Sequence, residues 1–135
     1  MSVQKNNKSS DSNSPIRNHV GAVYVPVRDM NRAVTWYNRL LGRDRDVNYN
    51  PEVPSEEKTI YSLALGETNI LLDSIGRDHV RASKNVLFNL KTDDLHASYQ
   101  YLKEMKANIL TPEEDAIYSI MLADPDGNLI KIHKD

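Results

Sequence analysis

The stretch VYVPVRDMNRAVTWYNRLLG, residues 23–42, carries the strongest local structural signals of the chain. Valines alternate with other residues at its start, and a period of two is typical of a half-buried strand. Asp29 then stands where a side chain can accept hydrogen bonds from the free amides of a first helical turn. Apolar residues follow at helical spacing on one face: Met30, Ala33, Val34, Tyr37, Leu40 and Leu41. Because Gly42 can adopt the left-handed conformation that ends a helix, the stretch predicts a strand, a capped helix and a stop.

The bulk composition limits the class of protein. The chain has 135 residues, enough for one domain with a real core. Its formal net charge of -2 and pI of about 6.1 give no strong field that would attract nucleic acid or an anionic membrane. The absence of cysteine excludes a disulfide scaffold, a thiol nucleophile and a thiolate metal site. No apolar run approaches the roughly 18–20 residues of a membrane span, so we expect a cytoplasmic protein.

The N-terminal residues differ in composition from the rest of the chain. Residues 1–17 are rich in Ser, Asn and Lys and contain few apolar side chains. Such a segment cannot bury enough apolar surface to offset its ordering entropy. The sequence therefore predicts a disordered tail over residues 1–17 and a single domain over residues 18–135.

The sequence predicts one structural module over residues 19–74, the first half of the domain. The module begins with the strand and helix predicted within residues 23–42. Further strands are expected over residues 43–50, 59–65 and 69–73. Gly66 and Glu67 form the turn between the last two strands. Module one is therefore a strand, a helix and three strands, and a polar linker follows over residues 75–84.

The second half repeats this pattern as module two, over residues 85–133. Asp93 or Asp94 caps a second amphipathic helix, and a shift of 65 positions superposes the apolar sites of the two helices. We place Asn108 at the left-handed position that ends this helix, because Asn tolerates positive φ. Strands are expected over residues 86–91, 108–110, 117–123 and 129–133, with the turn DPDGN over residues 124–128. The sequence thus predicts an α+β fold of two βαβββ modules that form a curved mixed sheet around a central cavity.

Three motifs in this order resemble one known family. They are VPVRDMNRAVTWYNRLLG, TDDLHASYQYLKE and DPDGN, over residues 25–42, 92–104 and 124–128. Together they resemble the glyoxalase, bleomycin-resistance and extradiol-dioxygenase superfamily, also called the vicinal oxygen chelate superfamily, over residues 19–133. The resemblance implies paired βαβββ modules, frequently in homodimers. It also implies a divalent metal, held by His and Glu, that polarises vicinal oxygens of a substrate.

The resemblance also implies where four metal ligands would lie in this chain. It places them at Ala22, Leu71, Leu87 and Lys131. Ala22 stands seven residues before the capping Asp29, and Lys131 stands seven residues after Asp124. The three apolar side chains offer no donor atom, and a lysine ammonium repels a cation unless it loses its proton, which is costly near neutral pH. Since the four histidines are also scattered without paired spacing, we predict a protein with no metal and no other cofactor.

Four residues are candidates for contact with a ligand: Tyr24, Asp73, Lys131 and His133. Tyr24 alternates onto the same face as Ala22 and would form an aromatic wall of the cavity, or fill the core instead. Lys131 would meet a carboxylate, phosphate or enolate of the ligand, or else pair with Asp73 or extend to water. His133 lies two residues past Lys131 and so shares its face.

These residues lead to three functional hypotheses. The first is a metal-independent homodimer that binds a small organic molecule in its cavity, as drug-sequestering relatives do, with no nucleic acid or membrane partner. The second is an enzyme, a lyase, isomerase or dioxygenase-like protein, that uses Lys131 or His133 for proton transfer or holds a metal on relocated donors. The third is an interaction protein with a vestigial cavity. The sequence identifies no catalytic residue.

Overall fold

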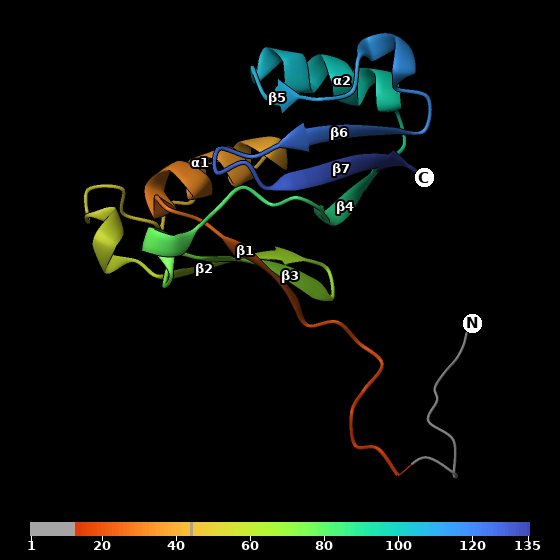
Figure 1. The fold of residues 1–135 in the computed structure, drawn as a ribbon. Coiled ribbons are helices and arrows are strands. Elements are labelled where there is room, and N and C mark those ends of the chain that lie inside the picture. The colour runs from red at the N-terminus through yellow and green to blue at the C-terminus, as the bar shows by residue number, and fades with distance from the viewer. Residues whose placement is uncertain (1–12, 44) are drawn as a thin grey trace.

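In the computed structural model, which describes residues 13–43 and 45–135, the chain forms two mixed β-sheets and two long helices (Figure 1). Sheet A has the strand order β1-β3-β2, from β1 (Ala22–Pro26), β2 (Ile60–Leu65) and β3 (Thr68–Asp73). Sheet B has the order β4-β7-β6-β5, from β4 (Val86–Thr92), β5 (Asn108–Ile109), β6 (Ser119–Ala123) and β7 (Leu129–Lys134). In each sheet the first and last strands of a module pair in parallel. The α+β class and the internal repeat are therefore confirmed.

The two helices occupy equivalent places in the two modules. They are α1 (Met30–Leu40) and α2 (Leu95–Glu104), and three single 3-10 turns, η1 (Ser55–Glu57), η2 (Arg77–His79) and η3 (Glu113–Asp115), lie in the connections. Both predicted caps are present, since Asp29 accepts from the Arg32 amide at 3.2 Å and Asp94 from the Ala97 amide at 2.9 Å. Among the described residues no helix is long and apolar enough to cross a membrane.

The two helices end in the same hydrogen-bond motif but on different residues. After α1, Gly42 has φ 67, and the amides of Gly42 and Arg43 donate to carbonyls of the last turn, as predicted for Gly42. After α2, Lys106 has φ 60 and its amide donates to the Lys103 carbonyl at 3.0 Å. The prediction that Asn108 would hold this position is wrong, because α2 is one residue shorter than α1 and Asn108 already begins β5.

The predicted strand over residues 43–50 is also wrong, since no strand forms in the part of that segment that the structure describes. Its polar side chains bond to the backbone instead. Asp46 accepts from the Asn48 amide and Asn50 from the Glu52 amide, both at 2.9 Å. Such local turns compete with a sheet ladder for the backbone. Module one is therefore βαββ, and a long loop connects α1 to β2.

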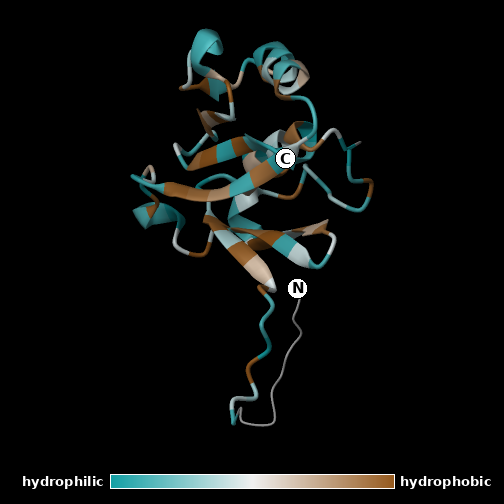
Figure 2. Ribbon diagram, turned by 90° about the vertical axis from the view of Figure 1, so that its right-hand side faces the viewer, coloured by the Kyte–Doolittle hydropathy of each residue, from teal (hydrophilic) through white to brown (hydrophobic). Residues whose placement is uncertain are grey.

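The core lies between the helices and the sheets. α1 packs on β2 and β3, and α2 packs on β6 and β7. Figure 2 shows that the strands carry much of the hydrophobic sequence, whereas the connections are mostly hydrophilic. At alternate positions β1, β3, β6 and β7 carry buried residues that face the helices, including Val25, Ile70 and Leu72 in sheet A and Ile120, Ile130 and Ile132 in sheet B. The intervening residues face away from the helices.

The described part of the predicted tail, residues 13–17, forms neither helix nor strand. The rest of the predicted tail, residues 1–12, lies outside the described residues.

Candidate functional site

Two of the predicted ligand residues lie on the face of sheet A that is opposite α1. Tyr24 pairs with Leu71 across β1 and β3, and Asp73 lies two residues further along β3. Because neighbours on these strands are buried beneath α1, Tyr24, Leu71 and Asp73 share the outer face. Tyr24 is 63% exposed, which contradicts the alternative that it fills the core. The Asp73 carboxylate accepts from the Ile75 amide at 2.8 Å.

The other two lie on the corresponding face of sheet B. Lys131 sits between Asn89 and Met121 on the neighbouring strands and between the buried Ile130 and Ile132 of β7, and His133 lies two residues further along β7. The His133 ring lies 2.7 Å from the Lys134 carbonyl oxygen, measured from Nδ1. Among the described residues no ion pair joins Lys131 to Asp73. The structure therefore pairs the candidates within each sheet, and among the described residues no hydrogen bond or ion pair links one pair to the other.

The four positions that the resemblance assigns to metal ligands are divided between the sheets. Ala22 and Leu71 belong to the outer face of sheet A, Lys131 belongs to sheet B, and Leu87 lies at a bulge of β4. Methyl, isobutyl and ammonium groups do not fit a divalent cation, which needs oxygen, nitrogen or sulfur lone pairs. Among the described residues no group of three or more His, Cys, Asp or Glu side chains could hold a metal ion.

The DPDGN turn does more than reverse the chain, because its side chains hold the two modules together. Asp124 accepts from the Tyr37 hydroxyl of α1 at 2.6 Å, from the amides of Asp126 and Asn128, and from the Asn128 side chain. Asn128 also donates to the Pro26 carbonyl at 2.9 Å. Burial, followed by the charge of Asp124, raises the pKa of Tyr37, so this hydroxyl remains a proton donor across the physiological range.

A buried carboxylate completes this contact between the modules. The Asp126 side chain is fully buried, and its Oδ1 accepts from Arg28 and Arg32, with the shortest guanidinium distance 3.0 Å. Burial raises the pKa of Asp126, although the two arginines oppose that effect. The sequence pattern indicated a turn and gave no sign of this network, since its partners are up to 102 residues away along the chain.

Two cavities lie on the helix side of the molecule. The first, here called the α1 pocket, has a volume of about 430 Å³. Its lining comprises Val34, Thr35, Asn38, Arg39, Gly42, Arg43, Arg45, Asp46, Tyr49, Pro51 and Tyr101. The second, of about 650 Å³, lies between the end of α1, the start of α2 and β4. Neither contains Tyr24, Asp73, Lys131 or His133.

The fold and the order of motifs are shared with known proteins. A family model of the Glyoxalase/Bleomycin resistance protein/Dioxygenase superfamily matches residues 16–132. The chain belongs to this superfamily. No curated protein matches the chain significantly.

Solved structures with the superfamily's fold cover nearly the whole chain. An integron cassette protein from the mobile metagenome of V. cholerae is 22% identical, with a TM-score of 0.58, over 88% of this chain and 96% of that one. TnmS3, an antibiotic binding protein from Streptomyces sp. CB03234, is 24% identical, with a TM-score of 0.59, over 90% and 98%. Lactoylglutathione lyase from Agrobacterium tumefaciens is 14% identical, with a TM-score of 0.61, over 90% and 96%. At these identities the likeness shows the fold.

Proposed function

We propose that this superfamily member binds a small organic molecule on the outer face of its two sheets, without a divalent metal, in the cytoplasm. The observation that carries the proposal is the set of side chains where the resemblance puts metal ligands: Ala22, Leu71, Leu87 and Lys131. Three apolar groups and one cation are unsuited to a metal but suited to an organic ligand, because ligand sites combine apolar walls with a few polar groups.

The exposed groups on this face indicate the ligand chemistry. Tyr24 offers an aromatic surface that is 63% exposed. The Lys131 side chain has neither a hydrogen bond nor an ion pair to any residue that the structure describes, so its ammonium is available to an anionic group. A flat molecule with a carboxylate, phosphate or enolate would pack against the Tyr24 ring and place its anionic group beside the Lys131 ammonium. The fold that the chain shares with the antibiotic binding protein TnmS3 supports a binding role.

A homodimer is part of this proposal. The outer face of sheet A and the chain leading into it leave large apolar side chains in solvent, with Val20 64%, Tyr24 63% and Ile60 46% exposed. Covering apolar area of this kind stabilises association. A second copy of the chain over this face would both bury these side chains and enclose a ligand beside Tyr24.

Two measurements test the proposal. Elemental analysis of untagged protein should find no stoichiometric divalent metal, and a thermal-shift screen should find a ligand that stabilises the fold. At a hundredfold excess over Kd a ligand adds about 2.7 kcal/mol to the free energy of unfolding. Lys131→Met should weaken binding, whereas Lys134→Met, at the exposed end of the same strand, should not.

Three results would contradict the proposal. Near-stoichiometric metal would do so, as would a screen in which every ligand found binds Lys131→Met as tightly as the unaltered protein. Turnover of the bound molecule that depends on Lys131 or His133 would favour the enzyme hypothesis instead.

A further inference from the structure

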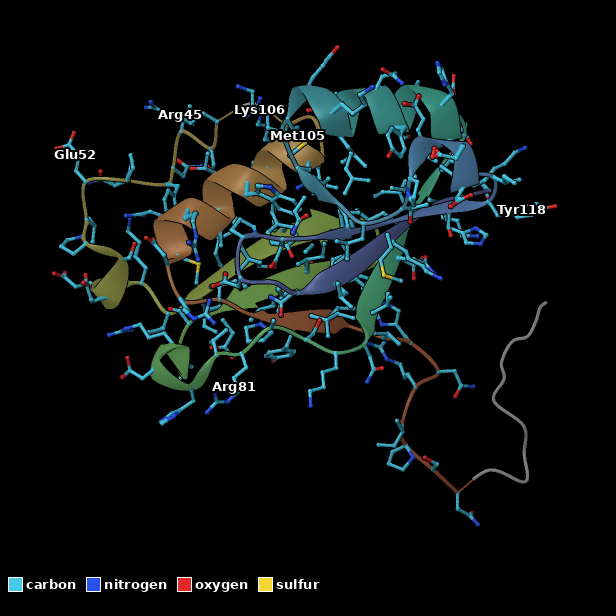
Figure 3. The ribbon with its side chains drawn as sticks, turned by 45° about the horizontal axis from the view of Figure 1, so that its top comes forward. Arg45, Glu52, Arg81, Met105, Lys106 and Tyr118 are labelled. Carbon is cyan, nitrogen blue, oxygen red and sulfur yellow. The ribbon has the colours of Figure 1, made fainter. Side chains whose placement is uncertain are left out.

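Three arginines line the α1 pocket. Arg39 comes from the last turn of α1, and Arg43 and Arg45 come from the loop that follows. All three residues are exposed, and Figure 3 shows Arg45 on the outside of the molecule near the end of α1. Arg43 donates to the Ala64 carbonyl, but no ion pair among the described residues includes any of the three arginines.

The carboxylate in the lining is already occupied. Asp46 accepts from the Tyr61 hydroxyl at 2.6 Å through Oδ2 and from the Asn48 amide at 2.9 Å through Oδ1. The hydrogen bond from Tyr61 lowers the pKa of Asp46, so the carboxylate is charged but both of its oxygens are engaged by other groups. Residue 44 lies outside the described residues. The described part of the lining therefore carries more positive than negative charge.

Apolar and aromatic side chains form a further part of the lining. Val34 is buried in its floor. Tyr49 is held edge-to-face against Tyr61 at a centroid distance of 5.4 Å, and the Lys58 ammonium lies 4.1 Å from the centre of the Tyr49 ring. Tyr101 reaches across from α2 and donates to the Arg39 carbonyl. These contacts fix two aromatic walls before any ligand arrives, which lowers the entropic cost of binding.

We propose that the α1 pocket is a second binding site, for a small aromatic carboxylate. The carboxylate lies among the guanidiniums of Arg39, Arg43 and Arg45, whose planar donors match its geometry. The ring lies against Tyr49 and Tyr101. A volume of about 430 Å³ falls within the roughly 300–1,000 Å³ range of small-molecule sites. The site is separate from the outer sheet face, because α1 packs on the opposite side of sheet A.

Calorimetric titration with 2-naphthoate and with the uncharged 2-naphthamide tests the charge requirement. We expect 2-naphthoate to bind saturably and 2-naphthamide to bind at least tenfold more weakly. The double variant Arg39→Gln/Arg45→Gln should weaken 2-naphthoate at least tenfold, since it removes charge-assisted hydrogen bonds. Arg81→Gln is the matched control, because Arg81 is also exposed but lies away from Arg45 (Figure 3) and should leave the Kd unchanged.

The location is tested separately from the charge. In ¹H–¹⁵N spectra, 2-naphthoate should shift the amide signals of Gly42 and Tyr49, and the double arginine variant should lose these shifts. The proposal is overturned if 2-naphthoate shows no saturable binding at millimolar concentration, or if 2-naphthamide binds as tightly. Equal binding to the double arginine variant would also overturn it, as would saturable binding that leaves the amide signals of Gly42 and Tyr49 unshifted.

Discussion

Lys106, the left-handed residue that ends α2, allows a stability test in which Gly42, the equivalent residue after α1, is the comparison. Lys106 has φ 60, a left-handed conformation that costs an ordinary L-residue roughly 1–2 kcal/mol relative to glycine. Gly42 holds the equivalent position after α1 with φ 67 and pays no such penalty. We therefore predict that Lys106→Gly stabilises the protein and that Gly42→Ala destabilises it.

The expected size follows from two opposing effects. Glycine at position 106 relieves roughly 1–2 kcal/mol of backbone strain, but it also gives the unfolded chain more freedom, which costs about 0.4–1 kcal/mol. Lys106 is exposed and forms no ion pair within the described residues, so little else is lost. The net gain is about 1 kcal/mol in the free energy of unfolding. A Cβ at Gly42 would meet nothing within 4 Å, so Gly42→Ala should lose a similar amount through the backbone alone.

Urea unfolding at 25 °C measures both changes. A difference of about 1 kcal/mol moves the midpoint by roughly 0.5 M for a slope near 2 kcal/mol/M. Lys106→Asn should fall between Lys106 and Gly, because Asn tolerates positive φ better than Lys does. A midpoint for Lys106→Gly at or below that of the unaltered protein would refute the assignment of strain to this residue. An unchanged midpoint for Gly42→Ala would refute it for both helices.

Three further predictions concern the described contacts. Gly127→Ala should destabilise the fold more than Gly66→Ala. Both glycines have positive φ, but a Cβ added at Gly127 would lie 2.7 Å from the Ala82 Cβ, whereas a Cβ at Gly66 meets nothing within 4 Å. In urea unfolding, Ala82→Gly should restore part of the stability that Gly127→Ala loses, and equal midpoints for Gly127→Ala and Gly66→Ala would contradict the clash. Tyr37→Phe should lower the free energy of unfolding by about 1.5–3 kcal/mol, because it removes a buried hydrogen bond to the Asp124 carboxylate. Tyr118→Phe, at a side chain that is 72% exposed (Figure 3), should leave the free energy of unfolding almost unchanged. Similar losses for the two variants would contradict the prediction. The Ser55 hydroxyl lowers the pKa of Asp29 below its ordinary value of 3.8, so Asp29 contributes stability that is present above pH 3.8 and is lost as the pH falls further. Asp29→Asn keeps the helix cap but should make the free energy of unfolding depend less on pH between about pH 5 and pH 2. An unchanged dependence of the free energy of unfolding on pH over this range would disprove the prediction.

The parts of the fold that local sequence determines were predictable. An aspartate cap acts on amides within the next few residues, so Asp29 and Asp94 could be read from sequence spacing alone. Strand alternation placed Tyr24 and Ala22 on one face and Lys131 and His133 on another, and the register agrees. These features depend on neighbours along the chain, which the sequence displays directly.

The parts that depend on distant partners were not predictable. Nothing near DPDGN in the sequence indicates that Asp124 accepts from Tyr37, 87 residues earlier, or that Asp126 lies against two arginines of module one. The α1 pocket was missed for the same reason. Arg43 and Arg45 stand in the segment predicted as a strand, and a strand would have carried them away from α1.

One local feature of residues 43–50 explains both the missing strand and the α1 pocket: the segment forms turns instead of an edge strand. An edge strand is bonded on one side only, so sheet A can lose it without breaking the ladder between β2 and β3. The Asp and Asn side chains of the segment satisfy its backbone in turns instead. The freed loop then folds beside α1, where Asn31 donates to the Pro51 carbonyl and accepts from the Tyr49 hydroxyl. Module one thereby departs from the βαβββ pattern at the place where the arginines and Tyr49 come together. A variant that restored the edge strand should therefore abolish 2-naphthoate binding in the α1 pocket while leaving the outer sheet face intact.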